Sequence, residues 1–177
     1  NGILDLKQGK LLPHDPQKLL TNLCDVEFDP EAKCPAWDNF IKDITSGDQE
    51  LIDFLQRLVG YCLTGETVEQ AMYIFQGPGS NGKSTFLETI KFILGDYAVK
   101  AQADSFMKKN NERINNDIAG LAGVRLVIAS EIAKGRHLDE SLVKELTGGD
   151  SITARKLYAE NFTFTPQFKI LLGLNDV

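Results

Sequence analysis

The run of residues 77–84 restricts the fold more than any other feature, because its letters GPGSNGKS fill every fixed position of the pattern G-x-x-x-x-G-K-[ST]. The apolar residues 71–76 before it predict a buried strand, and residues 84–90 after it predict a helix. A strand, a glycine-rich loop and a helix in this order are the setting in which the motif binds phosphate. A chance turn of Gly, Ser and Lys is the alternative, and these flanks argue against it.

Each residue type in this loop has a physical role in holding a triphosphate. The glycines let backbone N–H groups approach the phosphates without a clash from Cβ, and the start of the helix adds partial positive charge. Lys83 is expected to reach the β- and γ-phosphates, and the Ser84 hydroxyl to hold Mg²⁺. We therefore expect ATP and Mg²⁺ as ligands. The expected binding residues are Gly77, Pro78, Gly79, Ser80, Asn81, Gly82, Lys83, Ser84 and Thr85.

Composition limits the other classes of function. The net charge of -6 gives no global sign of nucleic-acid binding, so any contact with DNA must come from a local cluster. Cys24, Cys34 and Cys62 are widely spaced; with His14 they fit no zinc finger, and reduced thiols in a cytosolic protein are the better interpretation. No apolar run is long enough to cross a membrane, so we expect no membrane partner. The chain starts at Asn1 rather than Met, and we interpret it as part of a longer polypeptide.

The first part of the chain predicts a small, mainly helical domain that opens with a β-hairpin. Residues 2–6 and 10–12 suggest the two short strands of that hairpin. Apolar residues then recur at helical spacing over 37–44 and again over 51–62. We place the end of this domain at residue 64.

Residues 65–177 predict an α/β domain with a mainly parallel sheet, because apolar strands and helices alternate after the phosphate loop. The polar residues 101–116 favour a solvated loop; a basic segment near nucleic acid, built on Lys108-Lys109-Asn110-Asn111, is the alternative. The other expected elements are strands over 124–129 and 168–174, a helix over 139–146 and a hairpin over 151–166.

Hydrolysis of ATP needs a group that prepares water close to the terminal phosphate. Ligands of open α/β sheets lie beyond the carboxyl ends of the strands, and two apolar strands here end in Glu131 and Asn175. An acid and an amide beside Lys83 could polarise water and sense the terminal phosphate. Taken singly, Glu131 could be a surface acid and Asn175 a turn residue. Their matching positions at strand ends favour the catalytic interpretation.

The chain resembles the primase-helicases of phages, plasmids and large DNA viruses, which are superfamily 3 helicases with ATPase domains of AAA+ type. The resemblance covers nearly the whole chain. In the α/β part it depends on GPGSNGKS, RLVIASE, KELTGGDSITAR and FTFTPQFKILLGLN; in the first part it depends on GILDLKQGKLLPHDP and DNFIKDITSGDQELIDFLQRLVGYCLTGET. The loop alone is generic, whereas KELTGGDSITAR followed by F-x-F-x-P is specific.

The resemblance assigns roles to the matching positions. It implies that Lys83, Glu131 and Asn175 are catalytic, with Glu131 activating water and Asn175 sensing the γ-phosphate. Ser84 and Glu131 are then the expected Mg²⁺ ligands. It also implies assembly into a ring, a hexamer in the full-length form, with a primase domain that could lie upstream, acting in the cytoplasm of the host of a phage, prophage or plasmid.

Two positions depart from the pattern. Ser130 stands where many phosphate-loop ATPases carry an Asp that helps to hold Mg²⁺. The arginine finger of the family would lie beyond the third motif, so we expect this stretch alone to lack it. Arg155, Arg136 and Arg125 remain as candidates for contacts across a subunit boundary.

The predicted hairpin carries Arg155, Lys156 and Tyr158 close together. With the family resemblance, we expect these residues to bind single-stranded DNA, since six copies in a ring would form a basic collar with aromatic side chains for stacking. An ordinary solvent-exposed hairpin is the alternative.

Two other functions stay open. A phosphate-loop kinase would need an arginine-rich lid, which the sequence does not show, and a non-catalytic module would bind ATP only to order subunits. An ATP-driven helicase is the interpretation that we favour.

Overall fold

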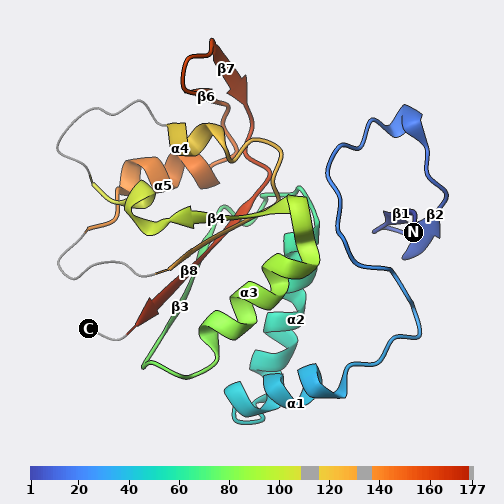
Figure 1. Cartoon of the computed structure of the whole chain (residues 1–177). Helices are drawn as coiled ribbons and strands as arrows, with labels where there is room; N and C mark the ends of the chain where they lie inside the picture. The colour runs from blue at the N-terminus through green and yellow to red at the C-terminus, as the bar shows by residue number, and fades with distance from the viewer. Residues whose placement is uncertain (109–115, 131–136, 176–177) are drawn as a thin grey trace.

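The computed structural model describes residues 1–108, 116–130 and 137–175. Its centre is a four-stranded parallel sheet in the order β3-β8-β5-β4 (Figure 1). The strands are β3 (Met72–Gly77), β4 (Ala98–Gln102), β5 (Leu126–Ser130) and β8 (Lys169–Asn175). The predicted α/β class with a mainly parallel sheet is confirmed.

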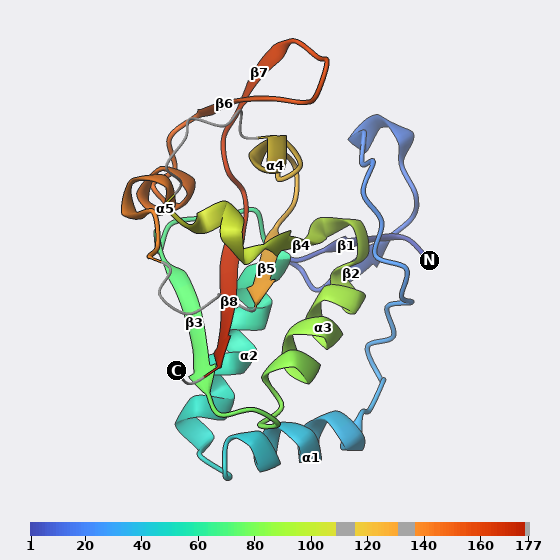
Figure 2. The ribbon, with the colours of Figure 1, turned by 60° about the vertical axis from the view of Figure 1, so that its left-hand side comes forward.

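Helices cover both faces of the sheet (Figures 1 and 2). One face carries three helices: α1 (Pro35–Ile44), α2 (Gln49–Leu63) and α3 (Lys83–Leu94). The other face carries the 3-10 turn η3 (Ala103–Phe106), α4 (Asn116–Ala119), α5 (Glu140–Thr147), and the hairpin of β6 (Ile152–Arg155) and β7 (Asn161–Phe164). The sheet is therefore the middle layer of three.

The alternation of side chains along β5 explains this layering. Leu126 and Ile128 belong to the core below α1, α2 and α3, whereas Val127 and Ala129 belong to the core on the opposite face. A strand buried on both faces reads as a continuous apolar run, as this one does. The helices of the first region share a core with the sheet. The segments on the two sides of the predicted boundary at residue 64 therefore pack against each other.

The N-terminal hairpin is present, formed by β1 (Ile3–Asp5) and β2 (Lys10–Leu12). After the short 3-10 turn η1 (Pro16–Lys18), residues 19–34 contain no helix or strand. This segment is attached near the end of α3, where Leu23 and Asp96 exchange two hydrogen bonds and the Cys24 thiol donates to the Leu94 carbonyl. The helices of the first region are thus concentrated between residues 35 and 63.

The expectation of a solvated loop over 101–116 is wrong in its first part. Strand β4 and turn η3 occupy residues 98–106, and Phe106 and Met107 are only 0% and 2% exposed. Lys108 is exposed, while Lys109, Asn110 and Asn111 lie outside the described residues. No helix in the described parts of the chain is long and apolar enough to span a membrane.

Lys169 is the least expected residue of the interior, because it is 2% exposed within an apolar strand. Its ammonium donates to the carbonyls of Thr64 (2.6 Å) and Glu66 (3.1 Å) and lies 4.5 Å from the centre of the Tyr61 ring. It thereby fastens the segment after α2 to the first residue of β8. Burial lowers the pKa of Lys169 to about 8, and burial raises the pKa of the neighbouring Cys62 thiol to about 11.

The first prediction concerns Gly95, which ends α3 with φ +53 and has no room for a side chain, since a Cβ there would collide with the Leu23 carbonyl oxygen. We expect Gly95→Ala to lower the free energy of unfolding by about 2–4 kcal/mol, from backbone strain and loss of the contact with residues 23–24. Gly149→Ala is the control, because Gly149 has φ +84 but open space around its Cβ position. If urea unfolding showed the same loss in the free energy of unfolding for both variants, this explanation would be contradicted.

The second prediction concerns the pH dependence of stability. Lys169 releases its proton near pH 8 in the folded state but near 10.5 when unfolded, so the unfolded state binds more protons between these values. The contribution of Lys169 to stability should therefore rise between about pH 8 and 10.5, by on the order of 1–3 kcal/mol, and be lost again as the pH falls from 10.5 to 8. Urea unfolding at pH 7 and 9.5 would compare Lys169→Met with the parent. Both would carry Cys62→Ala, because that thiol titrates in the opposite sense. If the free energy of unfolding depended on pH in the same way in both proteins, the proposed effect of Lys169 would be excluded.

Candidate nucleotide-binding site

The phosphate loop joins β3 to α3 and is held from below by α1. Ser80 and Gly82 adopt left-handed backbone conformations, with φ 59 and 85. A Cβ on Gly82 would lie 2.5 Å from Cγ2 of Ile44, at the end of α1, so only glycine fits there. Pro78, Gly79 and Ser80 are exposed, which leaves the outer side of the loop open to a ligand.

The Lys83 ammonium lies across the loop rather than extending into solvent. It donates to the carbonyls of Gly77 (2.8 Å) and Pro78 (3.0 Å) and to Oδ1 of Asn81 (2.8 Å). Three acceptors hold the positive charge next to the loop backbone, where an anion would also bind. Sequence reasoning included Asn81 in the loop but did not assign it this contact with Lys83.

Ser84 and Thr85 lie in the first turn of α3, and both are exposed. Free backbone N–H groups at a helix start attract anions, and a hydroxyl there can complete the coordination of a Mg²⁺ held by phosphates. The described residues contain no cluster of three His, Cys, Asp or Glu that could bind a metal by itself. The residues present therefore fit a Mg²⁺ that would arrive with a triphosphate, and the roles of Ser84 and Glu131 as its ligands stay predictions.

Parallel pairing puts Asn175 at the same edge of the sheet as the loop. Asn175 is opposite Gly77 in the pairing of β8 with β3, and Ser130 is opposite Gly173 in the pairing of β5 with β8. Asn175 is exposed at this edge. Glu131 follows Ser130 directly but lies outside the described residues, so its predicted role stays a prediction.

A cavity of about 410 Å³ lies beside the loop, and sequence reasoning did not predict it. It is bounded by the end of α1, by α2, by the outer edge of β3, and by Asn81 and Lys83. Phe54 of α2 and Tyr73 of β3 face each other in its wall, with ring centroids 6.4 Å apart. Burial raises the pKa of the Tyr73 hydroxyl above its ordinary value.

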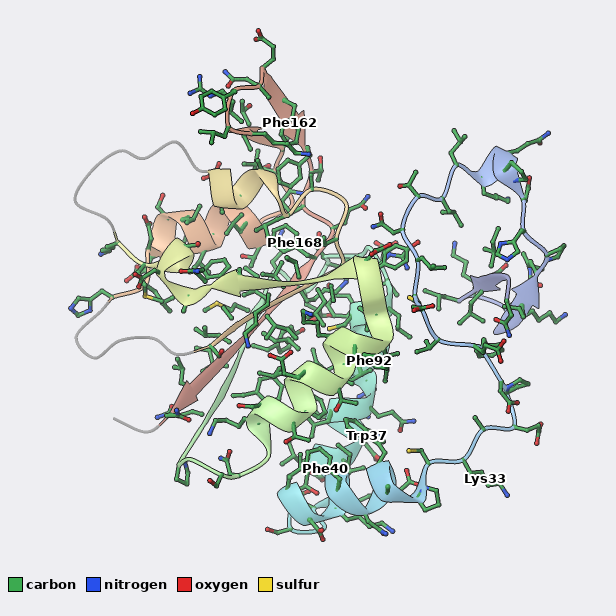
Figure 3. The ribbon with its side chains drawn as sticks, in the orientation of Figure 1. Lys33, Trp37, Phe40, Phe92, Phe162 and Phe168 are labelled. Atoms are coloured by element: carbon green, nitrogen blue, oxygen red, sulfur yellow. The ribbon has the colours of Figure 1, made fainter. Side chains whose placement is uncertain are left out.

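The β6–β7 hairpin carries the residues predicted to bind DNA, and it lies far from the phosphate loop. It projects from the opposite end of the sheet (Figure 2). Arg155 and Lys156 are exposed, and Tyr158 is 98% exposed at the tip with a left-handed φ of 59. Phe162 (labelled in Figure 3) and Phe164 pack against the core on this face and stack on each other, with ring centroids 5.8 Å apart.

Arg125 is engaged inside the fold. Its guanidinium donates to the Leu63 carbonyl (2.6 Å) and lies 4.2 Å from the centre of the Tyr97 ring. Arg155 is exposed on the hairpin, and Arg136 lies outside the described residues. Of the two candidates that lie within the described residues, Arg125 is engaged and Arg155 is accessible.

Comparison with known families gives two matches along the chain. A family described as "D5 N terminal like" matches residues 1–46. A second one, described as "Family of unknown function (DUF5906)", matches residues 75–177, which include the phosphate loop, the hairpin and Asn175.

Similar proteins come from large DNA viruses. "Putative helicase L207/L206" of Acanthamoeba polyphaga mimivirus is 31% identical over 183 residues, a match that covers 100% of this chain and 19% of that protein. "Putative primase C962R" of African swine fever virus (isolate Warthog/Namibia/Wart80/1980) is 26% identical over 178 residues, covering 93% of this chain and 18% of that protein. The chain therefore spans less than a fifth of the length of these two relatives.

The fold also matches a solved structure. The apo A form of the NrS-1 C-terminal region superposes with a TM-score of 0.64 at 13% identity, over 82% of this chain and 34% of that one. The identity is too low to carry more than the fold. The mimivirus protein, in contrast, matches along the whole chain at 31% identity. This chain belongs to the family described as "Family of unknown function (DUF5906)", and it is similar to proteins of large DNA viruses that are named putative helicases and primases, as its motifs indicated.

Proposed function

We propose that this chain is the ATP-binding motor part of a replicative DNA helicase, of AAA+ type, that moves on single-stranded DNA. In the full-length protein it assembles into a ring, with a hexamer as the expected form, and a primase domain lies in the same polypeptide. MgATP binds at residues 77–85, with Lys83 on the β- and γ-phosphates and Ser84 on the metal ion. Glu131 prepares water and Asn175 responds to loss of the γ-phosphate.

One observation carries this proposal, namely the pairing of Gly77 with Asn175. These residues are almost a hundred positions apart in the chain, yet they lie side by side at the carboxyl edge of the sheet. The backbone of the phosphate loop and the exposed side-chain amide of Asn175 meet there, next to the Lys83 ammonium. A group that is to sense a terminal phosphate has to lie at this edge.

The position of the hairpin supports a link between ATP and DNA. Strand β8 has seven residues and ends at Asn175, and the hairpin precedes its first residue, Lys169, by a short connection. At about 3.3 Å per residue, a seven-residue strand spans roughly 20 Å. A shift of β8 at the phosphate end would therefore be passed to the base of the hairpin through one continuous strand.

The first test of this proposal concerns Lys83. We expect Lys83→Ala to weaken MgATP binding by at least tenfold, because it removes the cation next to the phosphates. Lys91→Ala is the matched control, since Lys91 lies in the last turn of the same helix. Calorimetric titration with MgATP would measure both. Unchanged affinity in Lys83→Ala would reject the site.

Phosphate release separates the helicase from its alternatives. In the longer protein, we expect hydrolysis to rise when single-stranded DNA is added and to be lost with Lys83→Ala. Phosphate transfer to a small molecule would indicate a kinase, and equal hydrolysis by mutant and parent would indicate a module that does not use ATP chemically.

The second test concerns the hairpin. We expect Arg155→Ala with Lys156→Ala to weaken binding of an oligo-dT strand about tenfold or more and to reduce its salt dependence, because phosphate contacts release counterions. Tyr158→Ala should weaken it further by about 1–3 kcal/mol through loss of stacking. Fluorescence anisotropy at several salt concentrations would measure this. The control is Lys7→Ala with Lys10→Ala on the N-terminal hairpin. An equal loss of affinity for the strand in this control would show that the effect depends only on net charge.

A further inference from the structure

Helix α1 packs against the point where the phosphate loop turns into α3 (Figure 2). A Cβ on Gly82, the N-cap of α3, would lie 2.5 Å from Cγ2 of Ile44 and 3.2 Å from the Phe40 ring. One turn further along α3, Phe86 stacks on Trp37, with ring centroids 5.7 Å apart. The three side chains of α1 are spaced three and four residues apart, so they share one face of that helix. This face supports both the end of the loop and the first turn of α3.

The same turn of α3 carries the groups expected to bind phosphate. Lys83 and Ser84 follow Gly82 directly, and the first backbone N–H groups of a helix have no partner within the helix. These N–H groups attract anions, but a hydrogen bond weakens steeply as its angle departs from a straight line. The position of Gly82 therefore decides how well the first turn of α3 is aimed at a phosphate.

The end of α1 is itself firmly fixed. The Thr45 hydroxyl is buried and donates to the Ile41 carbonyl (2.7 Å). The backbone N–H of Gly47, which has φ +76, donates to the Lys42 carbonyl (2.8 Å) and closes the helix. Asp48 then caps the start of α2 directly afterwards. A support that is held in this way can restrict the loop that packs on it.

From this arrangement we infer that Ile44 and Phe40 are positioning residues of the phosphate site, through which the helical first region sets the affinity for phosphates. The inference rests on the proposed binding of a nucleoside triphosphate at residues 77–85. The two side chains act through Gly82 and not by contact with the ligand. They restrict the loop and the first turn of α3 to the conformation that binds. If α1 moved away, the loop would spend less time in this conformation, and the apparent affinity would fall in proportion.

The first experiment measures this effect by calorimetric titration of the chain with MgATP and with magnesium tripolyphosphate, which has the phosphates but no nucleoside. We expect Ile44→Ala to weaken the binding of both ligands about fivefold or more, and by the same factor, because they share the phosphates. Val59→Ala is the matched control and should change neither affinity by more than about twofold. Val59 packs against the same core, but it lies near the end of α2, which Arg125 and Lys169 hold at the other edge of the sheet.

A second set of variants separates positioning from a general loss of stability. Gly82→Ala puts a methyl group against Cγ2 of Ile44 and should weaken the binding of both ligands by about tenfold or more. In this background Ile44→Ala makes room for the new methyl group, so it should strengthen binding about threefold or more. The recovery stays partial, because alanine at φ +85 is strained. Ile44→Val keeps the Cγ2 methyl group and should give no gain.

The change of sign is the decisive result, since a substitution that only destabilised the fold would lower affinity in both backgrounds. The inference would be overturned if Ile44→Ala bound both ligands as tightly as Val59→Ala does. It would also be overturned if, on Gly82→Ala, Ile44→Ala improved binding no more than Ile44→Val. Failure of the proposed function looks different. In that case Lys83→Ala would leave the binding of MgATP and of tripolyphosphate unchanged.

Discussion

The parallel pairing of β8 with β3 and β5 is the constraint on which both the core and the candidate site depend. In this register Ile170 and Leu172 face one core and Leu171 faces the other. A shift by one residue would exchange the two faces of the strand and would also move Asn175 away from Gly77. The packing of apolar side chains thus fixes the position of the polar residue at the end of the strand. Gly77 and Asn175 therefore need no side-chain contact with each other to be held side by side, because the register of β8 fixes their positions.

The phosphate loop, the ends of its neighbouring strands and the apolar stripes of α1 and α2 could be predicted from sequence, because each is a local pattern. Strand β4 could not, since it lies at the edge of the sheet and carries polar residues. Lys100 in that strand forms an ion pair with Glu88 of α3 (2.6 Å), and this contact is visible only after folding. Lys169 is a similar case. A lysine inside an apolar strand is visible in the sequence, but its carbonyl partners Thr64 and Glu66 lie more than a hundred residues away.

The cavity was beyond sequence reasoning for a different reason. Its walls come from two regions that the sequence separates at residue 64, and each wall on its own resembles ordinary core. The structure brings them together because α1 and α2 share one core with α3. The stacking of Trp37 (labelled in Figure 3) on Phe86, with ring centroids 5.7 Å apart, illustrates this. The same packing places Ile44 against Gly82. The helical region thus contacts the phosphate loop directly, at a position where no side chain larger than hydrogen fits.

This contact gives the helical region a mechanical role in the proposed motor. Gly82 of the phosphate loop has a left-handed conformation, and the end of α1 packs where a Cβ of this residue would lie. Movement of α1 and α2 would change the support below the loop and the wall of the cavity at once. Movement of β8 would act on the hairpin instead. The proposed nucleotide site therefore lies between two elements: α1, which belongs to the first region of the chain, and β8, which leads back to the hairpin with the residues proposed to hold DNA.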